Sequence, residues 1–355
     1  MFKFKHKPFH HTHAAYEDAN KLYHRELEHT KKNHWRDWLE KAEDLDIWTV
    51  NKVLAAPASD GGSSKIPTLR HITNNIERLA KTNDEKGIVL AKSFFPPKPH
   101  PEPPITDTEY PPPCSKTNKI TREIIARQLR KLRPYKAPGP DGIPNIILTK
   151  CADLLLDRLF HIYTAIYNNR LYYKPWKTFN TIVLHKPGKP SYEIPKAYRP
   201  ITLINTLWKV LTAILAEQLT FLAEKHKLLP DHHFGGCPGR TTTDAMHLLT
   251  YKINGAWRKG KVAAVLFLDV EGAFPNAVQT KLIHNLRKRG VPTKLINFAA
   301  GMLDGRVTNL KFDDYTSAPI PIDNGIGQGD PLSMALYQFY NTDILDIPNV
   351  KTSPP

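Results

Sequence analysis

The sequence predicts a protein of the α+β class, and three kinds of local pattern carry that prediction. Apolar residues recur at three- and four-residue spacing over about 14–45, 121–132 and 203–225, as they do on amphipathic helices. Residues 178–185 have the alternating pattern of a half-buried strand. Residues 262–268 form an uninterrupted apolar run, which predicts a strand that is buried on both faces.

Charge is the most informative property of the composition. The 355 residues carry a net charge of +16, which favours a polyanionic partner because neutralised phosphates release counterions. A ribosome-associated or merely basic protein would share this composition. No apolar run approaches the length of a membrane span, and the polar N-terminus does not resemble a signal peptide. The three scattered cysteines fit a reducing compartment and predict no disulfide framework.

Residues 1–54 are predicted to form a basic and partly helical extension. Four histidines near its start could suggest a metal site: His6, His10, His11 and His13. No cysteine accompanies them and the flanking residues are polar, so a disordered basic tail is the favoured interpretation. From Ala14 onward the spacing becomes helical, and we interpret its apolar stripe as a docking face rather than a platform for nucleic-acid bases.

Residues 55–116 are predicted to contain a loop, a helix and a proline-rich linker. The loop covers 55–64, which is rich in alanine, glycine and serine, and the helix covers about 74–94. Nine prolines then fall between Pro96 and Pro113, which excludes both helix and sheet and predicts an extended spacer. We place the main domain boundary in this spacer.

Residues 117–260 begin with a helix for which Thr121 is the expected N-cap. Two turns of the proline–glycine type at 136–143 end this helical stretch, and helical periodicity resumes over 148–167. The strand predicted next is turned back by the sequence KPGKP at 186–190, which makes a hairpin.

Asp269 follows directly after the apolar run and is therefore expected at the carboxyl end of a buried strand. An isolated aspartate at such a place is usually a turn former or a helix cap. Here Gly272 and Ala273 keep the next turn small enough for backbone N–H groups to approach a phosphate, and Phe274 stands beside the same pocket. A carboxylate at a rigid strand end also suits Mg²⁺, which prefers hard oxygen ligands.

Residues 325–333, with the sequence GIGQGDPLS, form a second candidate element. Three glycines at alternate positions expose the backbone to close approach by a ligand, and Pro331 lies near the start of an apolar helix at about 332–345. A dinucleotide-binding interpretation fails, because Asp330 interrupts its glycine spacing and too few residues follow for a strand–helix–strand unit. The start of a helix would explain the glycines, but it would not explain the complete sequence GIGQGDPLS.

A third candidate element combines the turn at 185–189, which carries Lys186 and Lys189, with the sequence YRPITL, which carries Arg199. Two lysines at a hairpin tip and a planar guanidinium make a reasonable clamp for a triphosphate. A hairpin with such charges is more often a solvated turn, so the charges alone leave both interpretations open.

Five blocks of sequence resemble the reverse transcriptases of non-LTR (LINE-type) retrotransposons and occur in the order found in that family. The blocks are KAPGPDGI at 136–143, YRPITL at 198–203, FGGCPGRTTTD at 234–244, VAAVLFLDVEGAF at 262–274 and GIGQGDPLS at 325–333. The resemblance implies the fold of a right-hand polymerase, with its fingers at 117–260, a partial palm at 261–347 and a tail at 348–355. It also implies RNA-directed DNA polymerase activity on an RNA template, a DNA primer and deoxynucleotides, without a membrane, at a nuclear location.

The resemblance implies roles for seven residues and Mg²⁺ as the cofactor. Asp269 matches the aspartate that binds the catalytic metal ions, and Phe274 matches the steric gate that rejects a 2′-hydroxyl. Pro275 stands where the family often has a further aspartate. The remaining residues match positions around the incoming nucleotide, the last two with a weaker role: Gln328, Gly329, Arg199, Lys186 and Lys189.

The third palm motif of that family, an aromatic residue and two aspartates on a hairpin, is expected after the last helix and has no match. Asp313 and Asp314 precede the glutamine–glycine motif, and Asp343 and Asp346 are spaced as on a helix, so neither pair is a credible substitute. The thumb has no match either. We therefore expect a truncated, catalytically incomplete polymerase fragment that binds Mg²⁺ poorly. The alternatives are an inactive basic nucleic-acid-binding fragment and a decayed product that does not fold.

Overall fold

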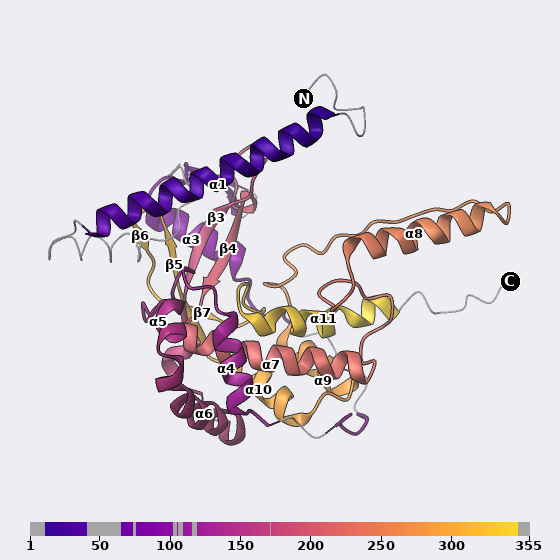
Figure 1. Ribbon diagram of the computed structural model, residues 1–355. Coiled ribbons are helices and arrows are strands. Elements are labelled where there is room, and N and C mark those ends of the chain that lie inside the picture. The colour runs from indigo at the N-terminus through magenta and orange to yellow at the C-terminus, as the bar shows by residue number, and fades with distance from the viewer. Residues whose placement is uncertain are drawn as a thin grey trace. The chain divides into compact units, whose positions relative to one another are not determined.

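The computed structural model describes residues 11–40, 65–73, 76–101, 105, 109–115, 119–170 and 172–346. The chain divides into two compact units, residues 1–57 and 58–355. In the first unit, helix α1 covers His11–Glu40, which confirms the helix expected from Ala14 onward (Figure 1). His11 and His13 lie in its first turn, so the expectation of a disordered tail is wrong for these two residues. The earlier histidines lie outside the described residues.

The second unit opens with a hairpin and a helix. Strand β1 (Leu69–Thr73) pairs antiparallel with β2 (Ile76–Ala80), and Leu69 lies opposite Ala80. Helix α3 (Asn83–Phe94) follows and begins with a capping box. In it, the Thr82 hydroxyl accepts the Glu85 N–H at 3.3 Å and the Glu85 carboxylate accepts the Thr82 N–H at 3.0 Å.

The single helix expected over 74–94 is therefore wrong in its first part, which is a strand. Ile72, Ile76 and Leu79 have the spacing of a helix face, yet all three are exposed. The buried residues are Leu69 and Ala80, which face each other across the hairpin and pack against the rest of the unit. Tertiary packing of this pair, and not the apolar spacing, decides the secondary structure here.

The second unit contains a five-stranded mixed sheet (Figure 1). Strand β3 (Thr178–His185) confirms the strand predicted there, and it pairs antiparallel with β4 (Tyr198–Leu203). On its other side β3 pairs in parallel with β5 (Arg306–Phe312). Strands β6 (Tyr315–Thr316) and β7 (Ile320–Ile322) both pair antiparallel with β5.

Eight α-helices accompany this sheet in the described part of residues 119–346. Thr121 caps the first of them as predicted, by accepting the N–H of Ile124. The turns at 136–143, the helices near 148–167 and 203–225 and the one after Pro331 are confirmed as well. The helices are α4 (Arg122–Lys131), α5 (Asn145–Lys150), α6 (Ala152–Asn169), α7 (Thr206–Lys225), α8 (Thr242–Trp257), α9 (Gln279–Lys288), α10 (Thr293–Leu303) and α11 (Pro331–Asp346).

Helix α7 is the core of the unit and runs beside α11 (Figure 1). Its buried side chains include Leu211, Ile214 and Leu215, and its Trp208 ring stacks on Phe298 of α10 at a centroid distance of 5.5 Å. By length and composition this helix could also span a membrane, although no such segment was expected. Because 61% of its apolar window is buried inside the protein, the helix has the character of a core helix.

The proline-rich segment packs against the second unit, although we expected the domain boundary there. The Cys114 N–H donates to the Gly290 carbonyl at 2.8 Å. The Tyr110 ring packs edge-on against His284 of α9, with centroids 5.7 Å apart. Its described residues lie in neither helix nor strand, as the prolines predict. The division between the compact units falls instead at Pro57.

The strand expected over 262–268 is wrong. The chain at 261–270 belongs to no strand and no helix. Val262 is 96% exposed, and Leu266 and Leu268 are about equally exposed at 79% and 80%. The segment pairs with none of the described strands, whose sheet has the order β4-β3-β5-β6 with β7 beside β5. An apolar run becomes a buried strand only where neighbours accept its backbone hydrogen bonds.

We predict that Gly139→Ala destabilises the second unit. A Cβ at Gly139 would lie 2.4 Å from the Asn205 backbone nitrogen and 2.5 Å from the Ile204 carbonyl carbon, which are backbone atoms that cannot turn aside. Overpacking of this kind costs roughly 1–3 kcal/mol. The matched control is Gly235→Ala, because a Cβ there meets no atom within 4 Å. Urea unfolding should separate the two variants, and equal midpoints would contradict the prediction.

Candidate functional site

Two segments that the sequence singled out meet through their backbones. The Gly325 N–H donates to the Ala277 carbonyl at 3.0 Å, and the Ile326 N–H donates to the Phe274 carbonyl at 2.9 Å. A Cβ at Gly325 would lie 2.5 Å from the Pro275 oxygen, and φ at this glycine is +73°. Only glycine combines that dihedral with so close an approach. The turn after Asp269 and the glycine-rich loop therefore form one backbone assembly.

The same loop lies against β4 on its other side. The Thr202 N–H donates to the Gln328 carbonyl at 2.8 Å. A Cβ at Gly329 would lie 2.6 Å from the Thr202 oxygen, and φ at this glycine is +122°. Arg199 lies on the same strand, opposite Leu184 of β3, and is exposed. Three of the five sequence blocks thus come together around one loop, although up to 130 residues separate them.

Phe274 is held by an aromatic neighbour on α11. Its ring stacks on Tyr337 with centroids 5.1 Å apart and an angle of 18° between the planes. Burial raises the pKa of the Tyr337 hydroxyl, and repulsion from Tyr340 and Asp269 adds to the rise. Tyr337 has no signal in the sequence beyond its place on an apolar helix.

Asp269 itself is exposed, in line with the exposed segment that carries it. Its carboxylate accepts the N–H of the next residue, Val270, at 3.0 Å. The chain places it close to Phe274 but not on a rigid strand end, so the expected anchoring of this carboxylate is wrong.

The β3–β4 hairpin contributes the basic side of the site. Lys186 donates from Nζ to the Lys196 carbonyl at 2.9 Å, and Lys196 pairs with Glu271 at 2.6 Å. The hydrogen bond and charge of Lys196 hold the pKa of Glu271 below its usual range, and Lys186 adds a smaller effect. The hairpin tip therefore lies beside the turn that follows Asp269. Lys189 is at the exposed end of the tip, apart from these contacts.

Aromatic side chains stiffen the hairpin. The Tyr198 hydroxyl donates to the Tyr192 carbonyl at 2.7 Å, and the Tyr192 hydroxyl donates to the Lys186 carbonyl at 2.9 Å. The His185 ring packs against both tyrosines, at centroid distances of 4.9 and 5.0 Å. The backbone of Lys186 is fixed by these bonds, and its ammonium group is held at the hairpin by the Lys196 carbonyl.

A buried arginine that the sequence gave no reason to single out supports the glycine-rich loop. Arg306, the first residue of β5, donates from Nη2 to the carbonyls of Asn324 and Gly325, at 3.1 and 2.7 Å. Its Nε donates to the Leu303 carbonyl at 3.0 Å. Burial lowers the pKa of Arg306 to about 10, so the group stays charged at neutral pH. Three hydrogen bonds compensate the burial of this charge.

Asp330 lies at the carboxyl end of the same loop, directly before α11. Its carboxylate accepts the Trp208 indole N–H at 3.2 Å and the Leu332 N–H at 2.8 Å. Burial of the carboxyl group raises its pKa to about 6, against hydrogen bonds and an attraction to Arg306 that act in the opposite direction. Part of the residue is accessible to solvent, but its carboxyl group lies among buried groups. In the sequence, Asp330 had appeared only as an interruption of a glycine pattern.

The described residues alone do not make a metal centre. Among them, no three histidine, cysteine or acidic residues lie together in a way that could hold a metal ion. Asp269 offers one carboxylate, and the nearby carboxylate of Glu271 is engaged by Lys196. Mg²⁺ needs an octahedral set of oxygen ligands, of which one protein carboxylate supplies only a small part.

The other aspartates considered in the sequence have structural partners. Asp313 lies in the turn after β5 with φ at +50° and accepts the Ile66 N–H at 3.2 Å. Asp314 accepts from the Asn83 side chain at 3.4 Å. Asp343 forms ion pairs with Lys281, Lys288 and Arg289 at 3.5 to 3.8 Å.

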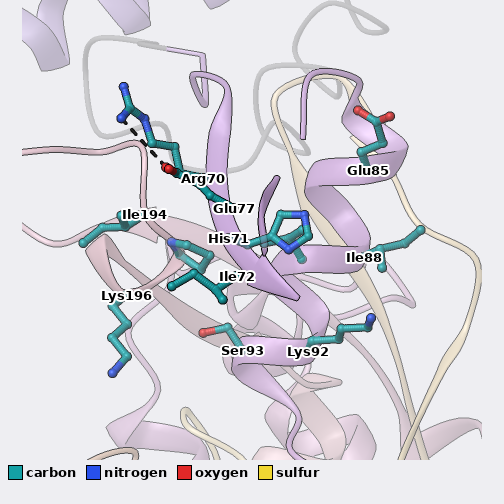
Figure 2. Close-up of a pocket in the computed structure, with 12 residues that line it drawn as sticks. Arg70, His71, Ile72, Glu77, Glu85, Ile88, Lys92, Ser93, Ile194 and Lys196 are labelled. Atoms are coloured by element: carbon teal, nitrogen blue, oxygen red, sulfur yellow. Dashed lines mark ion pairs between the residues drawn. The ribbon is translucent and has the colours of Figure 1, made fainter. Parts of the chain in front are cut away.

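A further cavity lies elsewhere, between the β1–β2 hairpin, α3 and the end of the β3–β4 hairpin (Figure 2). Its volume is about 870 Å³, and Ile72, Ile88 and Ile194 line it. None of the seven predicted site residues does. A small cavity of about 30 Å³ lies under the glycine-rich loop, beside Arg306 and Asp330. Backbone contacts between predicted blocks, and not cavity size, therefore define the candidate site.

We predict that Asp330→Asn changes the pH dependence of stability. The pKa of Asp330 is about 6 in the folded protein against 3.8 as its ordinary value. As pH rises from about 4 to 6, Asp330 loses its proton in the unfolded chain before it does so in the folded protein. The free energy of unfolding of the wild type therefore falls by roughly 3 kcal/mol relative to that of the variant. The asparagine can still accept the Trp208 hydrogen bond. Urea unfolding of both proteins at pH 4, 5, 6 and 7 measures this difference, and parallel curves would refute the assignment.

Known proteins are similar in sequence to this chain. Residues 184–352 match the family model described as reverse transcriptase (RNA-dependent DNA polymerase). The chain is 30% identical over 225 residues to the probable RNA-directed DNA polymerase from transposon BS of Drosophila melanogaster, covering 63% of this chain and 25% of that protein. It is 27% identical over 225 residues to the RNA-directed DNA polymerase from mobile element jockey of the same species, covering 63% of this chain and 24% of that protein.

A third relative is the retrovirus-related Pol polyprotein from type-1 retrotransposable element R2 of Popillia japonica, 28% identical over 228 residues. That match covers 64% of this chain and 30% of the relative. The matched region thus spans only 24% to 30% of the length of these curated relatives. The chain carries a reverse transcriptase domain and is a relative of the RNA-directed DNA polymerases of non-LTR retrotransposons.

Proposed function

We propose that residues 117–347 act as the fingers and part of the palm of an RNA-directed DNA polymerase and bind the incoming deoxynucleotide. The observation that carries this proposal is the contact of three sequence blocks around the loop at 324–330. The backbone of this loop is bonded to the Phe274 turn on one side and to Thr202, on the strand of Arg199, on the other. In this proposal residues 1–54 and 55–116 are an extension and a linker, and 348–355 is a tail.

The sugar of the nucleotide would lie against Phe274. Stacking on Tyr337 fixes the plane of this ring, so that it presents a rigid apolar surface. A 2′-hydroxyl pressed against such a surface loses its hydrogen bonds to water and gains none. This is the physical basis on which Phe274 would select deoxynucleotides.

The phosphates would lie toward the basic hairpin. Arg199 and Lys189 are exposed there, and Lys186 is held at the hairpin by the Lys196 carbonyl. Gln328 and Gly329 lie against the strand that carries Arg199, through the hydrogen bond from the Thr202 N–H to the Gln328 carbonyl at 2.8 Å. An anionic triphosphate would be attracted to this side of the site rather than to the side of Asp269.

Asp269 would supply one oxygen ligand to Mg²⁺, and we route no chemical step through the metal. The other ligands must come from phosphates or from groups outside the described residues. The RNA template and DNA primer are proposed as partners because the chain carries a net charge of +16, which favours phosphate backbones.

A second candidate function is nucleic-acid binding without polymerisation. It is favoured by the single carboxylate at the site and by the exposure of the segment that carries it. Basic charge suffices for such binding, because neutralising phosphates requires no metal and no anchored aspartate.

Primer extension on an RNA template by the full chain tests both functions. We expect binding of the primer–template with a steep dependence on salt between 50 and 200 mM, as for proteins that contact about six to ten phosphates. Any extension with Mg²⁺ or Mn²⁺ should disappear in Asp269→Asn, since the amide is a poorer metal ligand. Binding without extension favours the second function. Extension that persists in the variant would contradict the role of Asp269.

Replacement of the proposed gate should relax nucleotide selection. Phe274→Val removes the flat ring while keeping an apolar residue, and we expect the preference for dGTP over GTP to fall about tenfold or more. Equilibrium titration of the two nucleotides measures this preference and needs no turnover. Phe274→Tyr is the matched control, because it preserves the ring that stacks on Tyr337. An unchanged preference in Phe274→Val would refute the gate.

A further inference from the structure

The glycine-rich loop is attached twice to one short stretch of chain, which runs from β4 into the first turn of α7. The Thr202 N–H donates to the Gln328 carbonyl at 2.8 Å. Further along the stretch, the Trp208 indole N–H donates to the Asp330 carboxylate at 3.2 Å. Arg199, which we place at the phosphates of the nucleotide, lies on the same stretch. The two bonds therefore fix where the loop lies relative to the strand of this arginine.

The first turn of α7 is also bonded to the turn at 136–143. The Asn205 side chain accepts the Asp141 N–H at 3.3 Å, and the Thr206 hydroxyl donates to the Ile143 carbonyl at 3.0 Å. Asn205 and Thr206 are both buried, with exposed fractions of 5% and 0%. A fourth sequence block is thereby joined to the three that meet at the loop.

Asn205 departs from a local rule in order to make this contact. It is the N-cap residue of α7, where an asparagine side chain usually accepts an N–H of its own helix. Here the side chain makes no cap hydrogen bond and accepts the N–H of Asp141 instead. Departures from local rules of this kind gather at functional sites. The helix thus gives up a cap in favour of attachment to the turn.

Aromatic packing holds the Trp208 ring in one orientation. The ring stacks on Phe298 with an angle of 20° between the planes. Trp176 and Tyr172 lie beside it, with centroids at 5.6 and 6.4 Å, and Trp208 is only 4% exposed. A ring packed so closely cannot turn its N–H toward another acceptor, so this donor is preorganised for Asp330.

We propose that Trp208 is a positioning residue of the nucleotide site. Its indole N–H holds the carboxylate of Asp330, and through it the loop, at a fixed place beside the strand of Arg199. A role in packing alone would need the ring but not the N–H. The inference rests on the proposed nucleotide site, whereas the attachment of the loop can be measured without a nucleotide.

Hydrogen exchange of the full chain tests the attachment. Trp208→Phe keeps an aromatic ring but removes the N–H. The amides of Thr202 and Ile326, which bond the loop to its two neighbours, should then exchange about tenfold faster. The matched control is Trp176→Phe, which makes the same change in a neighbouring ring. Among the described contacts, Asp330 accepts from Trp208 and not from Trp176. Equal exchange in the two variants would overturn the proposal.

A double-mutant cycle separates the hydrogen bond from packing. Asp330→Leu removes the acceptor and keeps a side chain of similar shape. In this background Trp208→Phe should change the exchange less than about twofold, because no bond is left to lose. Loss of both partners of a buried hydrogen bond costs less than loss of one. Should Trp208→Phe alone not fold, a folded double variant supports the proposal and an unfolded one overturns it, as additive effects would.

Titration with dGTP connects the attachment to nucleotide binding. Trp208→Phe should raise the Kd of dGTP about five- to tenfold. The Kd of the primer–template should stay within about twofold, since its many phosphate contacts do not depend on this loop. Trp176→Phe should change neither value. A wild type that binds no dGTP would contradict the proposed function, while hydrogen exchange still decides the attachment. Where the wild type binds dGTP, an unchanged Kd in Trp208→Phe would overturn the positioning role.

Discussion

The candidate site depends on a close approach of three backbone segments at a loop without side-chain volume. Gly325 lies against the turn of Phe274 and Gly329 against Thr202, both at distances that no Cβ tolerates. Both glycines also have positive φ angles. Any larger residue would separate the turn from β4 and with it the aromatic side of the site from the basic side. The geometry of the whole site is therefore set by two positions that carry no chemistry of their own.

Charge in the site is divided between a buried part and an exposed part. Arg306 is buried and donates three hydrogen bonds, and the carboxyl group of Asp330 lies among buried groups, so both residues fix the loop with little influence from salt. Lys196 and Glu271 are about three-quarters exposed, so their ion pair is weak and is screened at physiological ionic strength. The loop is thus the rigid part of the site, and the contact between hairpin and turn is its adjustable part.

Several helices and strands could be predicted because residues that are close in the sequence determine where they begin and end. Thr121 caps its helix and the strand over 178–185 has the predicted bounds. The glycines of GIGQGDPLS predicted a close approach by a ligand, which stays a prediction; in the structure Gly325 and Gly329 allow a close approach by other backbone segments. The hairpin at 69–80 could not be predicted in this way, since its apolar spacing is helical and only packing of Leu69 and Ala80 selects strands. Arg306 had no signal, because its partners are carbonyls that the sequence does not display. The strand over 262–268 failed for the opposite reason: its local signal is strong, but pairing is not a local property.

The parallel pairing of β3 with β5 sets an order of events when the protein is made. Thr181 and Thr308 share a hydrogen bond across this pair, although 127 residues separate them. At a synthesis rate of about 5–20 residues per second, roughly 6 to 25 s pass between their emergence from the ribosome. Over that interval the edge of β3 that later pairs with β5 is open, and the glycine-rich loop that β5 supports through Arg306 does not yet exist. The candidate site is therefore the last part to take shape, and a nascent chain has to keep this sheet edge from other strands until then.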